Sequence, residues 1–247
     1  MERPGRQPPN GIDISVILPV YNEAECIEAV VRELFEHLSR LRAHRVEVLA
    51  VDDGSSDGTA AALARLRIAY DNLRVIRLTP NAGQSAALGA GFRHARGHFI
   101  VTLDADGQID PADIPAFVEA LAGCDCVFGY RERRQDTFSK RWGSRWANCI
   151  RNAVLGENII DTGCPLKAFR AEFVREIPMW KGMHRFLASF CCMKGAEIRQ
   201  MPVRHRTRLA GQSKYSNWGR LTRTIADLLA VRWMKKRSTR FEEKEVL

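Results

Sequence analysis

The chain has 247 residues, of which 45% are hydrophobic and 27% are charged, and its formal net charge is +9. This composition excludes a disordered chain, and the length is sufficient for one large domain with a sizeable core. Residues 1–11 lack the apolar segment of a secretory signal, and no apolar run approaches the length of a transmembrane helix, so we expect a cytoplasmic protein. The seven cysteines form no CxxC pair, which argues against a zinc site or a disulfide framework.

Charge is divided unevenly along the chain. Residues 1–130 carry 12 Lys and Arg against 18 Asp and Glu, a net charge of −6, whereas residues 131–240 carry 25 against 8, a net charge of +17. An acidic half suits a bound cation, and a basic half suits an anionic partner. Nucleic acid, a membrane surface and a phosphorylated substrate all fit the basic half at this stage.

Apolar runs alternate with helical periodicity through the first 130 residues. Strands are predicted at residues 14–18, 46–51, 73–78, 98–103 and 124–130, with helices between them. Asn22 is predicted to cap the first helix, which buries Ile27, Val30 and Val31. Strands that alternate with helices predict an α/β fold with a mostly parallel sheet and helices on both of its faces.

Three of the predicted strands end in loops that carry carboxylates, and the carboxyl ends of parallel strands share one edge of the sheet. Asp104 and Asp106 lie two residues apart at a strand end, so they can hold one hard cation, and Gln108 adds a neutral oxygen. The residues of the same DADGQ segment are also typical of a turn, which would hold no metal. Because the three acidic loops converge at one edge of the sheet, the cation site is favoured over the turn. The carboxylates concerned are Glu23, Asp52, Asp53, Asp104 and Asp106.

Two further helices are predicted in the basic half. A helix over residues 138–155 aligns Trp142, Trp146, Ile150 and Val154, which suits either core packing or a groove that faces lipid. A helix over residues 216–237 is amphipathic and basic, which suits the headgroup region of an anionic membrane, and a tail follows at 238–247. The alternative for this helix is packing against the rest of the folded chain.

Two function classes compete on these observations. A non-enzymatic binder of nucleic acid or of an anionic membrane would explain the basic half. It would not explain the converging carboxylates, which repel phosphate unless a cation intervenes. An enzyme that acts on a phosphorylated substrate through a bound cation explains both halves.

Several short motifs follow one another in a specific order. They are ILPVYNE (17–23), VDDGSSDGT (51–59), NAG (81–83), DADGQ (104–108), GYR (129–131), DTGC (161–164) and RLAGQSKY (208–215). The first four resemble the signatures of the family 2 glycosyltransferases, which have the GT-A fold. The last three narrow the resemblance to the polyprenyl-phosphate sugar synthases, such as dolichol-phosphate mannose synthase and its bacterial undecaprenyl-phosphate relatives. The resemblance runs from about residue 14 to about residue 233.

The resemblance implies a catalytic domain at 12–215, with a nucleotide and metal half at 12–130 and an acceptor half at 131–215. Mg²⁺ or Mn²⁺ would be held by Asp104, Asp106 and Gln108. The catalytic set would be Asp104, Asp106, Arg131 and Asp161. The nucleotide sugar would be bound by Pro19, Tyr21, Glu23, Val51, Asp53, Asp104, Ala105, Asp106, Arg131, Arg208 and Lys214.

The resemblance also implies the acceptor and the reaction. Arg145 and Arg208 would face the acceptor phosphate, and Asp161 would act either as a base or as an orienter of arginines. The expected reaction is an inverting transfer of one sugar to a polyprenyl phosphate. GDP-mannose is the first expectation for the donor, because the pattern of Arg131, Arg208 and Lys214 resembles the mannose synthases. UDP-linked glucose, GlcNAc, galacturonate or aminoarabinose is the alternative.

The expected location is the cytoplasmic face of a membrane. Many relatives continue into transmembrane helices, so attachment here is expected to be peripheral or supplied by a membrane-anchoring partner subunit. Nucleic acid is not expected as a partner, and a homo-oligomer stays open.

Overall fold

The computed structural model describes residues 11–132, 138–207 and 218–239, and within these it leaves the side chains of 138–146 and 218–224 undescribed. The strands are β1 (Ile14–Val20), β2 (Val46–Asp52), β3 (Leu73–Arg77), β4 (Phe99–Thr102), β5 (Cys126–Arg131), β6 (Lys167–Arg170) and β7 (Ile198–Val203). The helices are α1 (Ile27–Leu38), α2 (Thr59–Ala69), α3 (Gln84–His94), α4 (Ile114–Ala120), α5 (Phe138–Leu155), α6 (Leu187–Met193) and α7 (Trp218–Arg237).

The described strands form a seven-stranded sheet in the order β3-β2-β1-β4-β6-β5-β7. The pairs β1–β2, β1–β4, β2–β3 and β5–β7 are parallel, whereas β6 runs antiparallel to both β4 and β5. The predicted α/β fold with a mostly parallel sheet is therefore confirmed. The antiparallel strand β6, which joins the two halves of the sheet, was not predicted.

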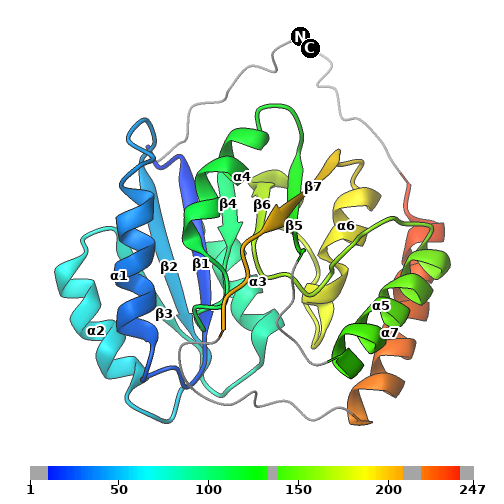
Figure 1. Cartoon of the computed structure of the whole chain (residues 1–247), viewed down its shortest axis with the longest axis horizontal. Coiled ribbons are helices and arrows are strands. Elements are labelled where there is room, and N and C mark those ends of the chain that lie inside the picture. The colour runs from blue at the N-terminus through cyan, green and yellow to red at the C-terminus, as the bar shows by residue number, and fades with distance from the viewer. Residues whose placement is uncertain (1–10, 133–137, 208–217, 240–247) are drawn as a thin grey trace, which may run out of the picture.

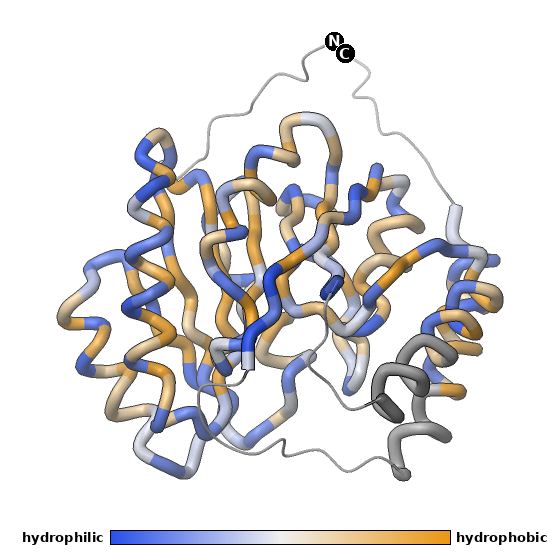
Figure 2. The backbone as a smooth tube through the Cα atoms, in the orientation of Figure 1, coloured by the Kyte–Doolittle hydropathy of each residue, from blue (hydrophilic) through white to orange (hydrophobic). Residues whose placement is uncertain are grey.

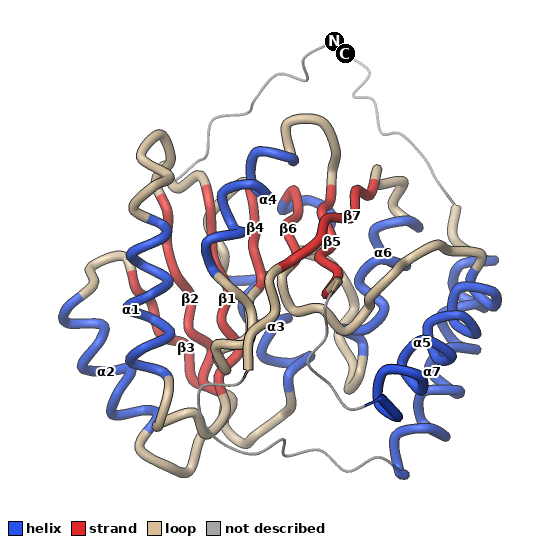
Figure 3. Tube along the Cα trace, in the orientation of Figure 1, coloured by secondary structure: helices blue, strands red, loops and turns tan. Residues whose placement is uncertain are grey.

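Helices cover both faces of the sheet (Figures 1 and 3). Side chains alternate along β1, so Val16 and Leu18 pack with α1, α2 and α4 on one face. Ile17 points to the other face, where it packs with α3, α6 and α7. Figure 2 shows apolar residues along the central strands, which lie between these two layers. Burial on both faces explains why the strands are nearly continuous apolar runs.

Helix α3 lies unusually close to β1 because it is built from small residues. A Cβ at Gly91 would stand 2.4 Å from Ile17 Cγ2, so only glycine fits at this position. The close approach fixes the start of α3 at the carboxyl edge of the sheet. That edge is where the three predicted acidic loops emerge.

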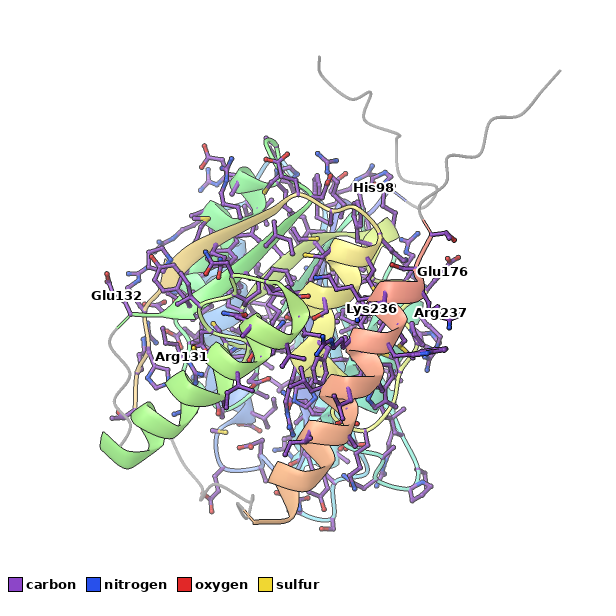
Figure 4. All side chains as sticks on the ribbon, turned by 90° about the vertical axis from the view of Figure 1, so that its right-hand side faces the viewer. His98, Arg131, Glu132, Glu176, Lys236 and Arg237 are labelled. Atoms are coloured by element: carbon purple, nitrogen blue, oxygen red, sulfur yellow. The ribbon has the colours of Figure 1, made fainter. Side chains whose placement is uncertain are left out.

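Helices α5 and α7 lie side by side at one end of the molecule, beyond α6 (Figures 1 and 4). Their anchor is a buried cluster in which Arg151 Nη2 donates to Glu157 Oε2 at 2.5 Å and Lys235 Nζ donates to Glu157 Oε1 at 3.1 Å. Leu228 and Val231 turn inward beside it. The inner face of α7 is therefore packed against the core on the α6 side of the sheet, which is one of the two predicted alternatives.

Candidate active site

An open cavity of about 270 Å³ lies at the carboxyl edge of the sheet, above β1, β2 and β4. It is formed by the loops after these three strands, by the start of α3 and by Lys181, which lies in the segment before α6. The predicted acidic loops therefore converge on one cavity. The lining residues are Pro19, Val20, Tyr21, Glu23, Asp53, Asn81, Gly83, Gln84, Ala87, Asp104, Ala105, Asp106 and Lys181.

The loop after β1 is held in place by the loop after β2. Asn22 has a positive φ of 53°, its N–H donates to Ser55 Oγ at 2.9 Å, and its side-chain oxygen accepts from Ser56 N–H at 2.8 Å. Glu23 N–H donates to Thr59 Oγ1 at 2.9 Å. Asn22 is thus not the helix cap predicted from the sequence, because α1 begins only at Ile27 and the Asn22 side chain is turned toward the neighbouring loop. These bonds present Tyr21 and Glu23 to the cavity.

Asp53 is buried and organises a third loop. Its carboxylate accepts from Asn81 Nδ2, Ala82 N–H and Gly83 N–H at 2.8, 2.8 and 2.7 Å. A carboxylate with this many donors is well satisfied without a ligand. Asp53 lines the cavity, and its described contacts make it the support of the loop that begins α3. Its predicted role toward the nucleotide sugar stays a prediction.

Asp104 and Asp106 both line the cavity at the end of β4. Burial, reinforced by the nearby charge of Asp106, raises the pKa of Asp104 from 3.8 to about 6, although Lys167, Gln84 and Arg131 act in the opposite direction. Gln84 Nε2 donates to Asp104 Oδ1 at 3.0 Å. Two carboxylates offer the hard oxygen ligands that Mg²⁺ and Mn²⁺ prefer, and a cation would relieve their mutual repulsion. The pair therefore fits the predicted metal.

Gln108 stands apart from this cavity, since it is not among the lining residues. Its N–H donates to Asp106 Oδ1 at 3.0 Å, and its carbonyl accepts from Arg206 N–H at 2.7 Å. The segment that follows the Asp104–Asp106 pair is thereby fixed at both ends. Ala105 lines the cavity, and its carbonyl lies 3.4 Å from the buried Cys26 thiol, which also contacts Glu23 Oε2 at 3.2 Å.

A largely buried charged group lies next to the Asp104–Asp106 pair, with Arg131 at the end of β5, Asp161 in the segment between α5 and β6, and Lys167 at the start of β6. Arg131 binds Asp161 through two parallel bonds, Nε to Oδ2 at 2.7 Å and Nη2 to Oδ1 at 3.0 Å. Lys167 is buried and donates to the carbonyl of Cys164, and burial lowers the pKa of Lys167 against the opposing charges of Asp104 and Asp161. The bidentate contact is the geometry expected of a carboxylate that orients an arginine.

The sequence of residues 15–178 matches the family described as "Glycosyl transferase family 2". The chain belongs to the family 2 glycosyltransferases. It is therefore an enzyme that transfers a sugar, as the motifs predicted.

Two curated relatives of this glycosyltransferase act on polyprenyl phosphates, by their names. The dodecaprenyl-phosphate galacturonate synthase of Rhizobium johnstonii is 34% identical over 240 residues, which cover 94% of this chain and 70% of the relative. The undecaprenyl-phosphate 4-deoxy-4-formamido-L-arabinose transferase of Pseudomonas fluorescens is 36% identical over 219 residues, which cover 87% of this chain and 63% of the relative. The chain thus spans less than two thirds of the arabinose transferase.

Solved structures show that the glycosyltransferase has the GT-A fold. Glucosyl-3-phosphoglycerate synthase of Mycobacterium tuberculosis, solved with Mn²⁺ and UDP-glucose, superposes with a TM-score of 0.65 at 21% identity, over 90% of this chain and 79% of that chain. A mannosyltransferase of Pyrobaculum calidifontis, solved with GDP-Man and Mn²⁺, superposes with a TM-score of 0.62 at 22% identity, over 93% and 65%. The predicted fold is confirmed.

Two of the residues predicted to bind the nucleotide sugar are not among the residues that line the cavity, and the side chains of three other predicted site residues are not described. Val51 is fully buried beneath the cavity and is not among its lining residues, and Arg131 is turned to Asp161. Arg208 and Lys214 fall outside the described residues, as does the side chain of Arg145. Their predicted roles toward the nucleotide sugar and the acceptor phosphate stay predictions.

A second group of potential metal ligands lies away from this cavity. The ligand atoms of Glu33, His37 and Asp110 come within 4.8 Å of one another. Arg206 already binds both carboxylates, at 2.6 Å to Glu33 Oε1 and 2.6 Å to Asp110 Oδ2. We interpret the group as an ion-pair cluster that joins α1 to the segment after β7.

Sequence reasoning missed three polar residues of this region. Gln84 follows the NAG motif directly and could have been found from its place at the start of α3. Lys181 and Lys167 carry no such signal, because lysine is usually solvent-exposed and neither position belongs to one of the seven motifs. Tertiary packing brings both to the site.

Within the described residues of the glycosyltransferase, no helix combines the length and the apolar character that a membrane crossing requires.

Proposed function

We propose that this glycosyltransferase transfers a single sugar from a nucleotide sugar to the phosphate of a polyprenyl lipid, with inversion at the anomeric carbon. The observation that carries the proposal is one cavity in which the Asp104–Asp106 pair faces the loops after β1 and β2. The ion pair between Arg131, at the end of β5, and Asp161, in the segment before β6, lies near this pair. The names of the curated relatives support the same class of acceptor.

The residues divide the work by position along the sheet edge. Tyr21, Glu23 and Asp53 shape the pocket of the nucleoside on the side of β1 and β2. Asp104 and Asp106 hold Mg²⁺ or Mn²⁺, which supplies charge neutralisation for the departing diphosphate.

The acceptor phosphate needs charge neutralisation more than it needs a strong base. The second pKa of a phosphate monoester is about 6, so its oxygen is largely ionised near neutral pH. This oxygen forms a bond to the anomeric carbon while the bond from that carbon to the diphosphate breaks. Arg131, oriented by Asp161, contributes positive charge on the acceptor side.

The donor sugar is a separate question. GDP-mannose is the first expectation from the sequence, and it stays a prediction. The sugars named for the relatives are galacturonate and 4-deoxy-4-formamido-L-arabinose, and these support the alternative class of donors.

The outer face of α7 supports peripheral attachment to an anionic membrane. Ile225, Leu229 and Trp233 recur at steps of four residues and are 51%, 56% and 61% exposed. Lys236 and Arg237 lie on the same helix (Figure 4). An exposed apolar stripe beside basic residues suits the interface between headgroups and acyl chains.

A lipid transfer assay tests the proposed function. Purified protein is incubated with Mn²⁺, undecaprenyl phosphate and radiolabelled nucleotide sugars, and the label is extracted into organic solvent. We expect label in the lipid fraction with the parent protein and none with Asp106→Asn. Label that appears only on a water-soluble acceptor, such as a phosphorylated glycerate, would contradict the lipid assignment.

A further inference from the structure

Asp161 lies outside any helix or strand, in the segment between the end of α5 and the start of β6. Its carboxylate binds Arg131 through two parallel bonds, and its Oδ1 also accepts from Gly163 N–H at 3.1 Å. The side chains of Arg131 and Asp161 are 13% and 7% exposed, so the ion pair is largely enclosed. Because no regular element fixes Asp161, the contacts of its segment determine where the carboxylate lies.

One side chain, that of Asn148 on α5, holds the segment on both sides of Asp161. Asn148 Nδ2 donates to the Ile160 carbonyl at 3.0 Å, and Asn148 Oδ1 accepts from Thr162 Oγ1 at 3.0 Å. The amide therefore uses its donor on the residue before Asp161 and its acceptor on the residue after it. Two bonds that flank a single residue restrain both the position and the direction of its side chain.

The rest of the segment has separate anchors. Asn152, one turn later on α5, binds the N–H and the carbonyl of Ile159 at 3.2 and 3.0 Å. Gln200 on β7 binds the backbone of residues 158 and 160 at 2.7 and 2.8 Å. Removing the Asn148 amide would therefore loosen a short stretch of chain and leave the rest of the segment in place.

The direction of the Arg131 guanidinium group depends on this short stretch. Two parallel bonds form only when both oxygens of Asp161 face the guanidinium edge. A Cβ at Gly163 would stand 3.2 Å from Arg131 Nη2, so the backbone after Asp161 also packs closely against the arginine. Arg131 in turn lies near Asp104 of the predicted metal site. A shift of the stretch around Asp161 would therefore displace a positive charge at the site.

We infer that Asn148 is a positioning residue, which holds Asp161 from both sides and thereby aligns Arg131 toward the acceptor phosphate. The inference rests on the proposed function for the role of Arg131, and it adds the residue through which α5 controls that role.

Steady-state transfer to undecaprenyl phosphate tests the kinetic part of the inference. The donor is whichever of UDP-galacturonate, UDP-glucose, UDP-GlcNAc and GDP-mannose gives the most labelled lipid with Mn²⁺. We expect Asn148→Ala to lower kcat/KM for the lipid about 10- to 100-fold, because a misplaced charge stabilises the transition state poorly. KM for the nucleotide sugar should change by less than about twofold. Thr162→Val removes one of the two bonds with little change of shape and should cost about threefold.

Two comparisons separate positioning from a general loss of stability. Asn72→Ala removes an asparagine that donates to the Val46 carbonyl at 2.9 Å, at the opposite edge of the sheet from the cavity, and should leave every kinetic constant unchanged. In an Asp161→Asn background, Asn148→Ala should have little further effect, because both changes act through the same carboxylate. A full additional loss in that background, or an equal rise of KM for both substrates, would overturn the inference.

Chemical labelling of Arg131 tests the positioning without any substrate. Phenylglyoxal reacts with guanidinium groups, and mass spectrometry gives the rate of reaction at Arg131. We expect severalfold faster labelling in Asn148→Ala and in Asp161→Asn than in the parent, because the guanidinium group is released from its carboxylate, and a parental rate in Asn72→Ala. An unchanged rate in Asn148→Ala would overturn the inference. Faster labelling of Asn148→Ala, together with a parent that transfers no sugar to the lipid, would support the positioning of Arg131 and contradict only the proposed function.

Discussion

Asp53 and Asp104 are carboxylates of the same cavity with opposite surroundings. Asp53 accepts three hydrogen bonds from residues 81–83, so its charge is stabilised by the protein itself. Asp104 accepts from Gln84 and lies near another carboxylate, and burial raises its pKa to about 6. The second arrangement is the one that a cation stabilises. At the residue scale, the number of donors around each carboxylate thus separates the structural aspartate from the predicted metal ligand.

Replacing the predicted metal ligands should abolish transfer. Asp104→Asn or Asp106→Asn removes one of two negative oxygen ligands, and we expect at least a 1,000-fold loss of turnover. Steady-state assays with Mn²⁺ measure the loss, and circular dichroism checks the fold. Near-parental activity of either variant in the presence of a chelator would exclude a metal role for the pair.

The raised pKa of Asp104 predicts a pH-dependent stability of the metal-free protein. Because Asp104 has a pKa of about 6 in the folded state and 3.8 in the unfolded state, the folded state binds more protons between these values. Its contribution to stability therefore falls as pH rises from about 4 to 6.

Asp104→Asn should remove this loss of stability with rising pH, because an asparagine side chain does not titrate. With a chelator present, we expect the free energy of unfolding of the variant to rise by about 1–2 kcal/mol relative to that of the parent between pH 4 and pH 7. This is less than the full pKa shift would give, because the side chain of Asp104 is partly exposed. Urea unfolding at both pH values measures the difference. If the two proteins differed in free energy of unfolding by the same amount at pH 4 and at pH 7, the raised pKa of Asp104 would be contradicted.

The roles left open for Asp161 can be separated by a double-mutant cycle. If Asp161 orients Arg131, Asp161→Asn should lower kcat/KM about 100-fold in the parent background and have little further effect in Arg131→Ala. A general base would instead give additive losses. The cycle is measured with saturating nucleotide sugar and varied lipid.

At the scale of elements, interlocked loops decide the shape of the cavity. The polar segment at residues 52–59 binds the loop after β1 through Ser55, Ser56 and Thr59. Much of what the polar side chains of this segment bind is therefore the neighbouring loop. The short strand β6 then brings Lys167 next to β4, where it pairs in register with Thr102.

The close packing of α3 on β1 predicts a stability effect. Gly91→Ala places a methyl group 2.4 Å from Ile17 Cγ2, and we expect a loss of about 1–3 kcal/mol in the free energy of unfolding. Gly58→Ala is the matched control, because its φ is −72° and its new methyl group would meet only Ala24 Cβ at 3.6 Å. Urea unfolding of both variants checks the prediction. Equal stability of the two would show that α3 adjusts to the extra methyl group.

At the scale of the whole molecule, the catalytic cavity and the exposed face of α7 belong to one compact body. Lys235 ties α7 to the carbonyl of Leu155 at 2.7 Å and to Glu157, while Ile225, Leu229 and Trp233 stay exposed. A membrane at the outer face of α7 would therefore bring a lipid phosphate to the same molecule that holds the nucleotide sugar.

Changing the exposed stripe should weaken membrane binding without unfolding the protein. Leu229→Asp with Trp233→Asp should reduce binding to phosphatidylglycerol vesicles more than tenfold, because both apolar contact and charge attraction are lost. Ile68→Asp is the control, since Ile68 is 84% exposed on α2, at the opposite end of the molecule (Figure 1). Vesicle sedimentation measures binding. Equal loss in the stripe variant and the control would contradict the role of α7.

The sequence by itself determined the class of fold and the family. Long apolar runs and helical periodicity are local properties, so β1, β2, α5 and α7 could be predicted close to their observed bounds. The motifs identified the Asp104–Asp106 pair and the family, because their order along the chain needs no coordinates.

Only the tertiary structure decided which side chains meet. Strand β6 has four residues and includes a buried lysine, so no periodicity marks it. Asn22 has a good capping side chain, and its backbone conformation and the neighbouring loop directed it elsewhere. Lys181 lies 77 positions after Asp104 in the sequence, and the bonds of its neighbours to Ser85 bring it into the same cavity. Contacts between distant segments depend on packing, which local sequence patterns do not encode.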